Sequence, residues 1–455
     1  MVTVGWQVGP PTPGTAQYTL PDFFNLNETE NQLLSTLITQ QLDQSQAGSE
    51  ATSPPQLCAA LEQVCLQSGL LPSRESANRI LQTALEYLQG YGPLNPLIAD
   101  PQLEEIAVTG VQEPVWVYHR QQGWLCTNAV LTNAQAAVHL INKMARPLGR
   151  RVSYQYPRLN TTLPDGSRLH ASIAPIAAKG VELTIRKFTP TPLSPVALIA
   201  RQTLSARTLA LLALALRTDH SLLVGGNTGS GKTSTLNALF GFVPLGERIV
   251  VTEETPEVRL PHSHVVQLVA NAELGISLKD LAQDTLRMRP DRVVIGEART
   301  PDEVHALLDA TLAGQARGTY ATFHADSARE ALYRLQSLGA RPPDLHALRL
   351  VLIQRRMSCP GSAQSTMREV RKVTELAEIT PEGEARLLVT YKAIEQQWIE
   401  HAWSTSGILG RVAEGYQCTV PAALKRIDEL AHWLEQTAQQ HPEQSLADFA
   451  RNVPS

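Results

Sequence analysis

Residues 221–240 read SLLVGGNTGSGKTSTLNALF: an apolar run of strand length, the pattern Gly-x-x-x-x-Gly-Lys-Thr, and then a helix-like run. Glycines let the backbone N–H groups of such a loop turn inward, and the amino terminus of the following helix adds partial positive charge. This arrangement suits the phosphates of a nucleotide. The predicted phosphate loop consists of Gly226, Asn227, Thr228, Gly229, Ser230, Gly231, Lys232 and Thr233.

Two residues of this loop have specific expected roles. We expect Lys232 to neutralise the β- and γ-phosphates of ATP, and Thr233 to offer its hydroxyl to Mg²⁺. The same pattern also arises by chance or marks a decayed site. A strand-like run before the loop and a helix-like run after it favour a genuine ATP site with Mg²⁺ as cofactor.

Acidic residues follow two further apolar runs. Glu253, Glu254 and Glu257 come after residues 248–252, and Glu297 ends a run of its own. Because ligands bind at the carboxyl ends of strands in doubly wound sheets, these carboxylates are candidates to orient water and to hold the water shell of a metal. The alternative is that each of them simply faces solvent.

A histidine ends the next apolar run. His324 directly follows residues 319–323. Taken alone, a histidine in this position is more often structural than functional. Beside the other strand ends, it is a candidate contact or sensor for the γ-phosphate.

The order of elements indicates an α/β fold for the second half of the chain. Strands alternate with helices from residue 195 on, which predicts a parallel sheet with helices on both faces. The apolar stretch at 196–216 contains several polar residues and is predicted to be one amphipathic helix. The strands are expected at residues 221–224, 248–252, 292–295 and 319–323.

The first half of the chain has a different pattern. Residues 106–108 and 115–118 predict a hairpin, residues 134–144 a helix, and residues 168–173 and 181–188 two more strands. The expected divisions are a flexible arm at 1–55 with a helix near 31–42, a helical segment at 56–91, an α+β domain at 92–188, a proline-rich linker at 189–195, a P-loop domain at 196–391 and a helical extension at 392–455.

Bulk composition narrows the class of protein. The 455 residues carry a formal net charge of -4, so no broad cationic field indicates nucleic acid as a partner. Five scattered cysteines suggest neither a disulfide framework nor a zinc site. The start lacks the pattern of a signal peptide, and no apolar stretch approaches the length of a membrane span, so we expect a cytoplasmic protein.

Four segments occur in order along the chain: GNTGSGKT (226–233), ERIVVTEETPE (247–257), LRMRPDRVVIGEAR (286–299) and TFHADS (322–327). They resemble the Walker A loop, Asp box, Walker B region and His box of the secretion ATPase superfamily, which powers type II secretion, type IV pili, tight-adherence pili and type IV secretion. The LRMRPD run is close to the tight-adherence and type IV secretion branch. Upstream, YGPL (91–94), LPDGSR (163–168) and IRKF (185–188) resemble the regulatory domain of that branch.

The resemblance, which covers about residues 75 to 390, implies a RecA-like P-loop NTPase core with a smaller α+β (PAS-like) N-terminal domain and helical extensions. It implies a hexameric ring that sits on the cytoplasmic face of an inner-membrane platform protein. The ring, peripheral to the membrane, would drive pilus assembly or retraction, or protein secretion. Direct contact with nucleic acid is not expected.

The resemblance also assigns residue roles. Glu257 takes the place of the glutamate that activates water, with Glu253 and Glu254 in support. Glu297 takes the Walker B role at Mg²⁺, where it joins Thr233 and acts through water. Arg168 and Arg186 match arginines of the smaller domain that reach the phosphates. A salt bridge within their own sheet is the alternative.

The sequence also departs from the family pattern. Glu254 stands where many members have Asp, and Gln315 where many have His. The Cys-x-x-Cys module of the type II branch is absent. Two other functions stay open at this point: a motor that translocates DNA or RNA, and a nucleotide-gated scaffold that barely hydrolyses ATP.

Overall fold

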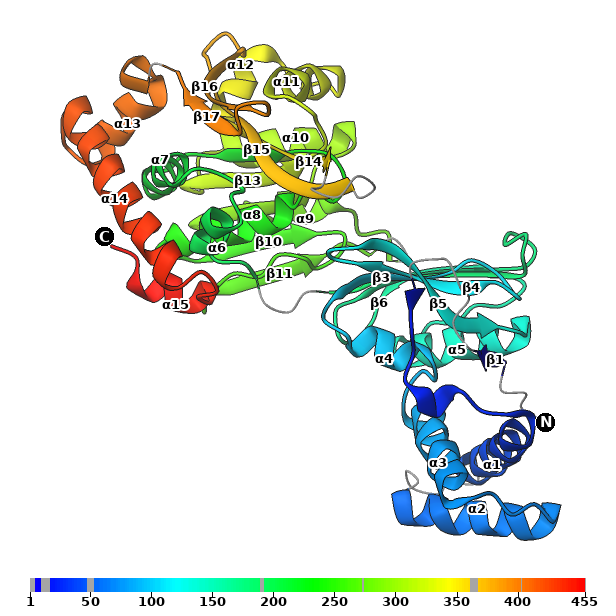
Figure 1. Cartoon of the computed structure of the whole chain (residues 1–455). Coiled ribbons are helices and arrows are strands. Elements are labelled where there is room, and N and C mark those ends of the chain that lie inside the picture. Colours follow the sequence, from blue (N-terminus) through cyan, green and yellow to red (C-terminus); the bar gives the residue numbers. More distant parts are fainter. Residues whose placement is uncertain are drawn as a thin grey trace. The chain divides into compact units, whose positions relative to one another are not determined.

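The computed structural model of the chain describes residues 5–9, 17–46, 53–188, 192–271, 274–360, 367–401 and 403–454. The chain divides into two compact units, Met1–Phe188 and Thr189–Ser455 (Figure 1). Each unit has hydrophobic cores of its own. The predicted linker lies at this division. Its residues 189–191 are outside the described part, and its last residue, Pro195, already opens a helix.

The first unit contains a twisted sheet in the order β1-β5-β4-β3-β8-β7-β6, and β2 also pairs with β5. Every pairing is antiparallel except β2 with β5. The predicted hairpin and the two later strands are confirmed. The strands are β1 (Trp6–Val8), β2 (Gln17–Tyr18), β3 (Leu103–Val108), β4 (Pro114–His119), β5 (Gly123–Leu131), β6 (Arg158–Thr162), β7 (Arg168–Ile173) and β8 (Val181–Arg186).

Helices α4 (Leu94–Ala99) and α5 (Ala134–Ala145) cover one face of this sheet (Figure 1). Strand residues alternate between buried and partly exposed, so every second side chain contributes to the core beneath the helices. A short 3-10 turn, η2 (Arg146–Leu148), follows α5. The predicted helix at 134–144 is confirmed.

The flexible arm predicted for residues 1–55 is wrong for the described part of that range, although the helix predicted within it near 31–42 is confirmed. There β1 pairs with β5, and α1 (Glu28–Gln46) packs with α2 (Pro54–Ser68) and α3 (Arg74–Gln89). The composition rich in Gln, Thr and Ser hid an apolar stripe on α1 that is buried against the other two helices, while Leu42 of the same helix is exposed. The buried side chains of α1 include Leu33, Leu34, Leu37 and Ile38. Residues 1–4, 10–16 and 47–52 lie outside the described part.

The second unit is built on a sheet in the order β11-β10-β12-β13-β9-β14-β15-β16-β17. The first six strands of that order are parallel, and the last three continue the sheet antiparallel. The four strands predicted from the sequence are confirmed. The strands are β9 (Leu222–Gly225), β10 (Ile249–Glu253), β11 (Val265–Val269), β12 (Arg292–Glu297), β13 (Gly318–Phe323), β14 (Leu350–Pro360), β15 (Met367–Ile379), β16 (Ala385–Lys392) and β17 (Gln397–Glu400).

Helices cover both faces of the parallel part, as predicted. Alternate residues of the strands enter two different cores: Val294 of β12 lies in one, and Val293 and Ile295 lie in the other. Sheet order and layering give a RecA-like core. The helices are α6 (Pro195–Ala200), α7 (Ala206–Arg217), α8 (Lys232–Leu239), α9 (Leu278–Thr285), α10 (Pro301–Leu312), α11 (Ala328–Ser337), α12 (Pro342–Leu345), α13 (Gly407–Gly415), α14 (Val420–Gln440) and α15 (Leu446–Asn452).

The single amphipathic helix predicted at 196–216 is wrong. The chain forms α6 and α7, with a break at the polar residues between them. Helix α7 is buried nearly all round, from Thr208 to Leu216, because the sheet lies on one side of it and α14 on another. A helix covered on all sides needs no polar face.

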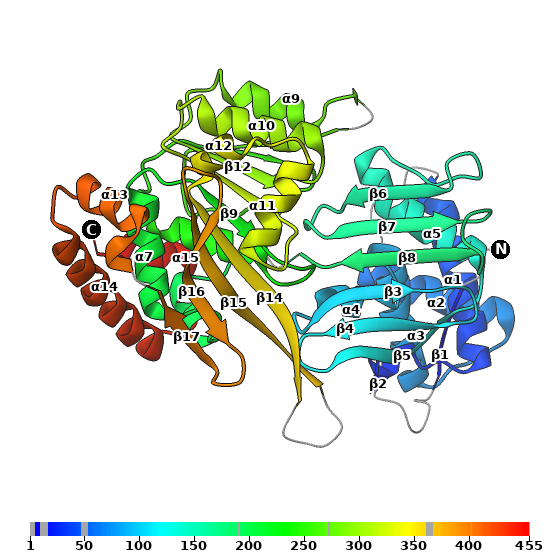
Figure 2. The ribbon, with the colours of Figure 1, turned by 90° about the horizontal axis from the view of Figure 1, so that it is seen from above.

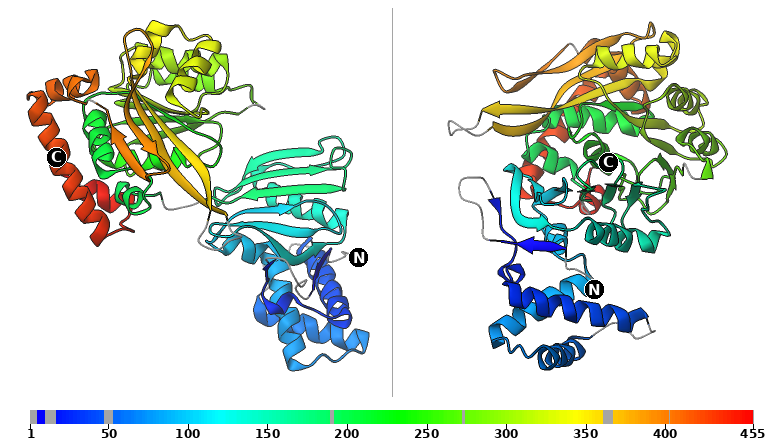
Figure 3. Two further views of the ribbon diagram at one scale, coloured as in Figure 1. Left: turned by 45° about the horizontal axis from the view of Figure 1, so that its top comes forward. Right: turned by 90° about the vertical axis from the view of Figure 1, so that its right-hand side faces the viewer.

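The helical extension predicted for residues 392–455 belongs to the unit itself. Strand β17 extends the sheet beyond residue 391, and α14 lies against α7. Figure 3 shows these C-terminal helices, in orange and red, beside the green helices that open the unit. Ile427, Leu434 and Phe449 are buried in the same core as α7. No helix in the described part of the chain is long and apolar enough to cross a membrane.

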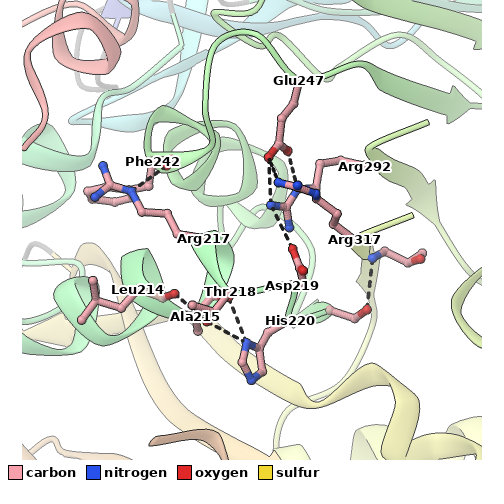
Figure 4. A network of polar contacts seen from close by, with 12 residues as sticks. Leu214, Ala215, Arg217, Thr218, Asp219, His220, Phe242, Glu247, Arg292 and Arg317 are labelled. Carbon is pink, nitrogen blue, oxygen red and sulfur yellow. Dashed lines mark hydrogen bonds and ion pairs between the residues drawn. The ribbon is translucent and has the colours of Figure 1, made fainter. Parts of the chain in front are cut away.

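A buried ionic network lies at the amino ends of β10, β12 and β13 (Figure 4). Arg292 is fully buried, and its Nε donates to Glu247 Oε2 at 2.6 Å while its NH1 donates to the Tyr320 hydroxyl at 2.9 Å. Arg317 NH1 donates to Glu247 Oε1 at 3.1 Å, and Asp219 Oδ1 lies 3.7 Å from Arg292 NH2. These contacts connect the starts of three strands.

Candidate functional site

The phosphate loop connects β9 to α8. Gly229 and Gly231 have φ values of 72° and 93°, in the left-handed region that favours glycine. Gly231 is the N-cap of α8, so the loop ends at the positive end of that helix. The Gly226 N–H donates to Phe323 O at 3.1 Å, which ties the loop to the carboxyl end of β13.

Lys232 and Thr233 lie where the motif requires. Lys232 is 9% exposed, and its Nζ donates to Gly226 O at 3.1 Å and to Asn227 O at 3.3 Å. The Thr233 hydroxyl donates to Glu257 Oε2 at 3.1 Å. The structure therefore brings one predicted acidic residue to the first turn of α8, 24 residues away in sequence.

Glu253 shapes the loop that carries Glu257. Its Oε1 accepts hydrogen bonds from the N–H groups of Glu257 at 2.8 Å and Val258 at 2.9 Å. Its Oε2 accepts one from Gln267 Nε2 at 3.1 Å. Burial raises the pKa of Glu253, and these donors oppose that rise. With both oxygens engaged, Glu253 is suited to positioning Glu257.

Glu297 and His324 meet at the carboxyl ends of β12 and β13. The His324 Nε2 lies 2.7 Å from Glu297 Oε1, and Arg299 NH2 donates to Glu297 Oε2 at 2.6 Å. Burial would raise the pKa of Glu297, but Arg299, His324 and Lys232 outweigh it and lower the pKa. Burial and then Lys232 lower the pKa of His324. An ionised carboxylate beside a neutral imidazole follows near pH 7.

Arg299 is the site residue that sequence reasoning left without a role. Besides Glu297 it contacts the exposed Glu254, whose Oε2 lies 3.0 Å from Arg299 NH1. The signal was present in the sequence, since an arginine two residues after a strand-end glutamate can turn back onto it. Arg299 thus connects the two acidic segments.

The oxygen donors fit Mg²⁺ shared with phosphates. Glu297 Oε1 is buried and accepts no aligned hydrogen bond from the residues that the structure describes, and the buried Ser230 hydroxyl likewise lacks a partner among them. Among those same residues, no group of three or more His, Cys, Asp or Glu could hold a metal. Mg²⁺ typically takes one or two carboxylates together with substrate phosphates.

Arg168 and Arg186 lie in the first unit, directly opposite each other on β7 and β8. Arg186 is also opposite Glu105 on β3. Residues paired in this way share one face of a sheet, here the face away from the core. The two arginines are therefore neighbours, and their contact with phosphates stays a prediction.

Residues 88–393 match the family described as "Type II/IV secretion system protein". An uncharacterised protein of Methanocaldococcus jannaschii is 40% identical over 233 residues, which are 49% of this chain and 32% of that protein. The type IV secretion system protein PtlH of Bordetella pertussis is 31% identical over 283 residues, 56% of this chain and 82% of that protein. The X-ray structure of the Legionella pneumophila ATPase DotB is 15% identical with a TM-score of 0.45, covering 84% of this chain and 96% of that one. The chain spans about a third of the first relative's length.

Proposed function

Because this chain belongs to the family of type II/IV secretion system proteins, we propose that it is an ATPase motor that couples hydrolysis to secretion or to pilus assembly or retraction. The observation that carries the proposal is the convergence of Lys232, Thr233, Glu257, Glu297 and His324 at one edge of the parallel sheet. Binding of a triphosphate, a metal and a water requires these side-chain types at one place.

Each residue of the site has its own proposed role. The loop amides and Lys232 would bind the phosphates. Thr233 and Glu297 would hold Mg²⁺, Glu297 through water. When bound, Mg²⁺ neutralises charge on the β- and γ-phosphates. Glu257, fixed by the contacts of Glu253 with its backbone, orients the attacking water and accepts its proton.

His324 is suited to sensing the γ-phosphate. Its neutral ring lies against Glu297, so it can donate or accept a hydrogen bond without adding charge. Arg168 and Arg186 are proposed to reach the phosphates when the first unit closes about the connector at 189–195. In this scheme residues 92–188 are a regulatory domain.

The proposed assembly is a hexameric ring on the cytoplasmic face of an inner-membrane platform protein. The motor belongs in this proposal to the tight-adherence or type IV secretion branch. Similarity to PtlH, over 82% of that protein, supports a role in type IV secretion. No direct contact with nucleic acid is proposed.

The proposal is tested by removing the charges of Lys232 and Glu297. Lys232→Ala is expected to weaken Mg-ATP binding and lower turnover by at least about 100-fold, and Glu297→Gln to lower turnover similarly while nucleotide still binds. Steady-state hydrolysis and calorimetry with Mg-ATP measure both effects. The exposed Lys392→Ala and Glu395→Gln are matched controls that should hydrolyse ATP normally. Wild-type rates in both site variants would overturn the proposal.

A further inference from the structure

The phosphate loop lies directly on the ribbon formed by β14 and β15. These long antiparallel strands run side by side (Figure 2), and β14 also pairs with β9, the strand that leads into the loop. A Cβ atom added to Gly226 would lie 2.0 Å from Gln354 O, and one on Gly231 would lie 3.0 Å from Gln354 Nε2. Glycine is needed at these positions for close packing on the ribbon as well as for turning the loop.

Gln354 is the centre of this contact. Its side chain is 2% exposed. Its Nε2 donates to Ser230 O at 2.6 Å, and its Oε1 accepts from the Thr235 hydroxyl at 2.5 Å. One buried amide thus joins the loop to the first turns of α8, across more than a hundred residues of sequence.

Two further contacts surround Gln354. Asn227 Oδ1 accepts from the Arg356 N–H at 2.9 Å, and Asn227 Nδ2 donates to Arg356 O at 3.1 Å. Arg371, which is opposite Arg356 on β15, donates from Nε to Gly229 O at 2.9 Å. The ribbon therefore contacts the loop at three residues, Asn227, Gly229 and Ser230.

Peptide geometry explains what these contacts do. In a trans peptide unit the C=O and the following N–H point in opposite directions. Since Gln354 binds the carbonyl of Ser230, the N–H of Gly231 points away from the ribbon. Arg371 binds the carbonyl of Gly229, and the N–H of Ser230 that follows donates within the loop to Asn227 O at 3.2 Å. The ribbon thus binds the carbonyls of Gly229 and Ser230 and leaves the Gly231 N–H directed away from it.

We infer that the β14–β15 ribbon is a positioning element of the nucleotide site, with Gln354 as its main positioning residue. The ribbon holds the Ser230–Gly231 peptide of the loop, with the Gly231 N–H turned toward the phosphates, before nucleotide binds. This inference rests on the proposed function, because it takes the loop to be a phosphate site. Pre-organisation of this kind raises affinity by reducing the ordering that binding must otherwise impose.

The experiment is a double-mutant cycle on Gln354 and Thr235. Gln354→Ala should weaken Mg-ADP binding about tenfold and raise KM for ATP by the same factor, since a buried hydrogen-bonding pair is lost. The kcat at saturation should stay within about threefold, because bound nucleotide itself orders the loop. The two substitutions together should weaken binding by less than the product of their separate effects, since they share one contact.

Two more variants complete the design. Arg371→Ala should weaken Mg-ADP binding about threefold, and Arg371→Lys should restore part of it because an ammonium can also donate to a carbonyl. Arg371 is exposed, so this pair remains informative if Gln354→Ala does not fold. Gln397→Ala, at an exposed position on β17, is the control and should leave both constants unchanged.

The outcomes separate the two proposals. A wild-type protein that does not bind Mg-ADP refutes the proposed function. Wild-type binding with unchanged affinity in Gln354→Ala and Arg371→Ala refutes only the positioning role of the ribbon. A fall in kcat at constant KM would place Gln354 in the chemical step and would also overturn the inference.

Discussion

The parallel strands carry ionic groups at both of their ends, and the groups at the amino ends (the amino edge) differ in role from those at the carboxyl ends (the carboxyl edge). At the amino edge, the buried carboxylate of Glu247 is matched by the buried Arg292 and by Arg317, which is partly exposed (Figure 4). At the carboxyl edge, Glu297 is matched by Arg299 on one oxygen, and its other oxygen has no aligned donor in the described part of the chain. The buried charges of the amino edge are paired, although the Nε2 of His220 there lacks a partner in the described part of the chain, and Glu297 at the carboxyl edge keeps an oxygen available for a ligand.

The difference indicates that a buried, paired charge contributes to stability, whereas a charge with an unused hydrogen-bonding site can bind a ligand. Burial opposes the charge of Arg292, but Tyr320 and Glu247 outweigh it and raise its pKa above the usual range. A buried, fully paired group of this kind stabilises one arrangement and has nothing left to bind a ligand. The Oε1 atom of Glu297 keeps an acceptor site for the water shell of the proposed Mg²⁺. Three substitutions test this contrast, from the largest expected effect to the smallest.

Arg292→Met should lower the free energy of unfolding by about 3–5 kcal/mol, because it leaves the buried Glu247 with one partner. Urea denaturation followed by circular dichroism measures the loss. The folded fraction should still bind Mg-ADP with wild-type affinity. Arg317→Met, at a side chain 55% exposed, is the control and should change stability by about 1 kcal/mol or less. If Arg292→Met lost nucleotide binding but kept its stability, the amino edge would not be the stabilising edge described above.

His220 makes the amino edge sensitive to acid. It is 3% exposed, and burial lowers its pKa from 6.5 to about 4. Between these two pH values the unfolded chain binds the proton and the folded chain does not, so stability falls as pH drops from 6.5 to 4 and levels off below. The effect is on the order of 3 kcal/mol.

His220→Asn tests this expectation, since asparagine keeps a donor near Ala215 O and does not titrate. The free energy of unfolding at pH 7 and at pH 4.5 is compared in both proteins. The wild type should lose more stability than the variant over this interval. Equal losses would mean that His220 is not held neutral by the fold.

Glu297→Gln should change the free energy of unfolding by about 1 kcal/mol or less, because its partner Arg299 is 50% exposed and can return to water. The same variant is expected to lose turnover. Glu247→Gln at the amino edge is the matched comparison, and it should destabilise more. If Glu297→Gln proved as destabilising as Glu247→Gln, the two edges would not differ in the way described.

Much of the second unit could be predicted from the sequence. The glycine loop, the four central strands and the strand-end residues Glu297 and His324 follow from patterns a few residues long. These patterns depend on local conformation: glycine at positive φ, apolar runs of strand length and polar residues where a strand ends. Parallel strands then bring their carboxyl ends together without further information.

Other features could not be predicted because a short stretch of sequence does not show which other elements pack against it. Polar residues between α6 and α7 were read as one face of a helix, although they mark a break. The composition of residues 1–55 predicts an arm, although the apolar stripe on α1 is buried by α2 and α3. Helix α14 completes the core of the second unit from far along the chain.

The sequence by itself determined the phosphate loop and the kinds of side chain that gather around it, because these depend on backbone freedom and on strand ends. Only the tertiary structure decided that Gln354 lies under that loop, that Arg299 connects Glu254 to Glu297, and that Glu253 serves Glu257. Such contacts depend on the order of strands in the sheet, and no periodicity along the chain encodes which strand lies beside which.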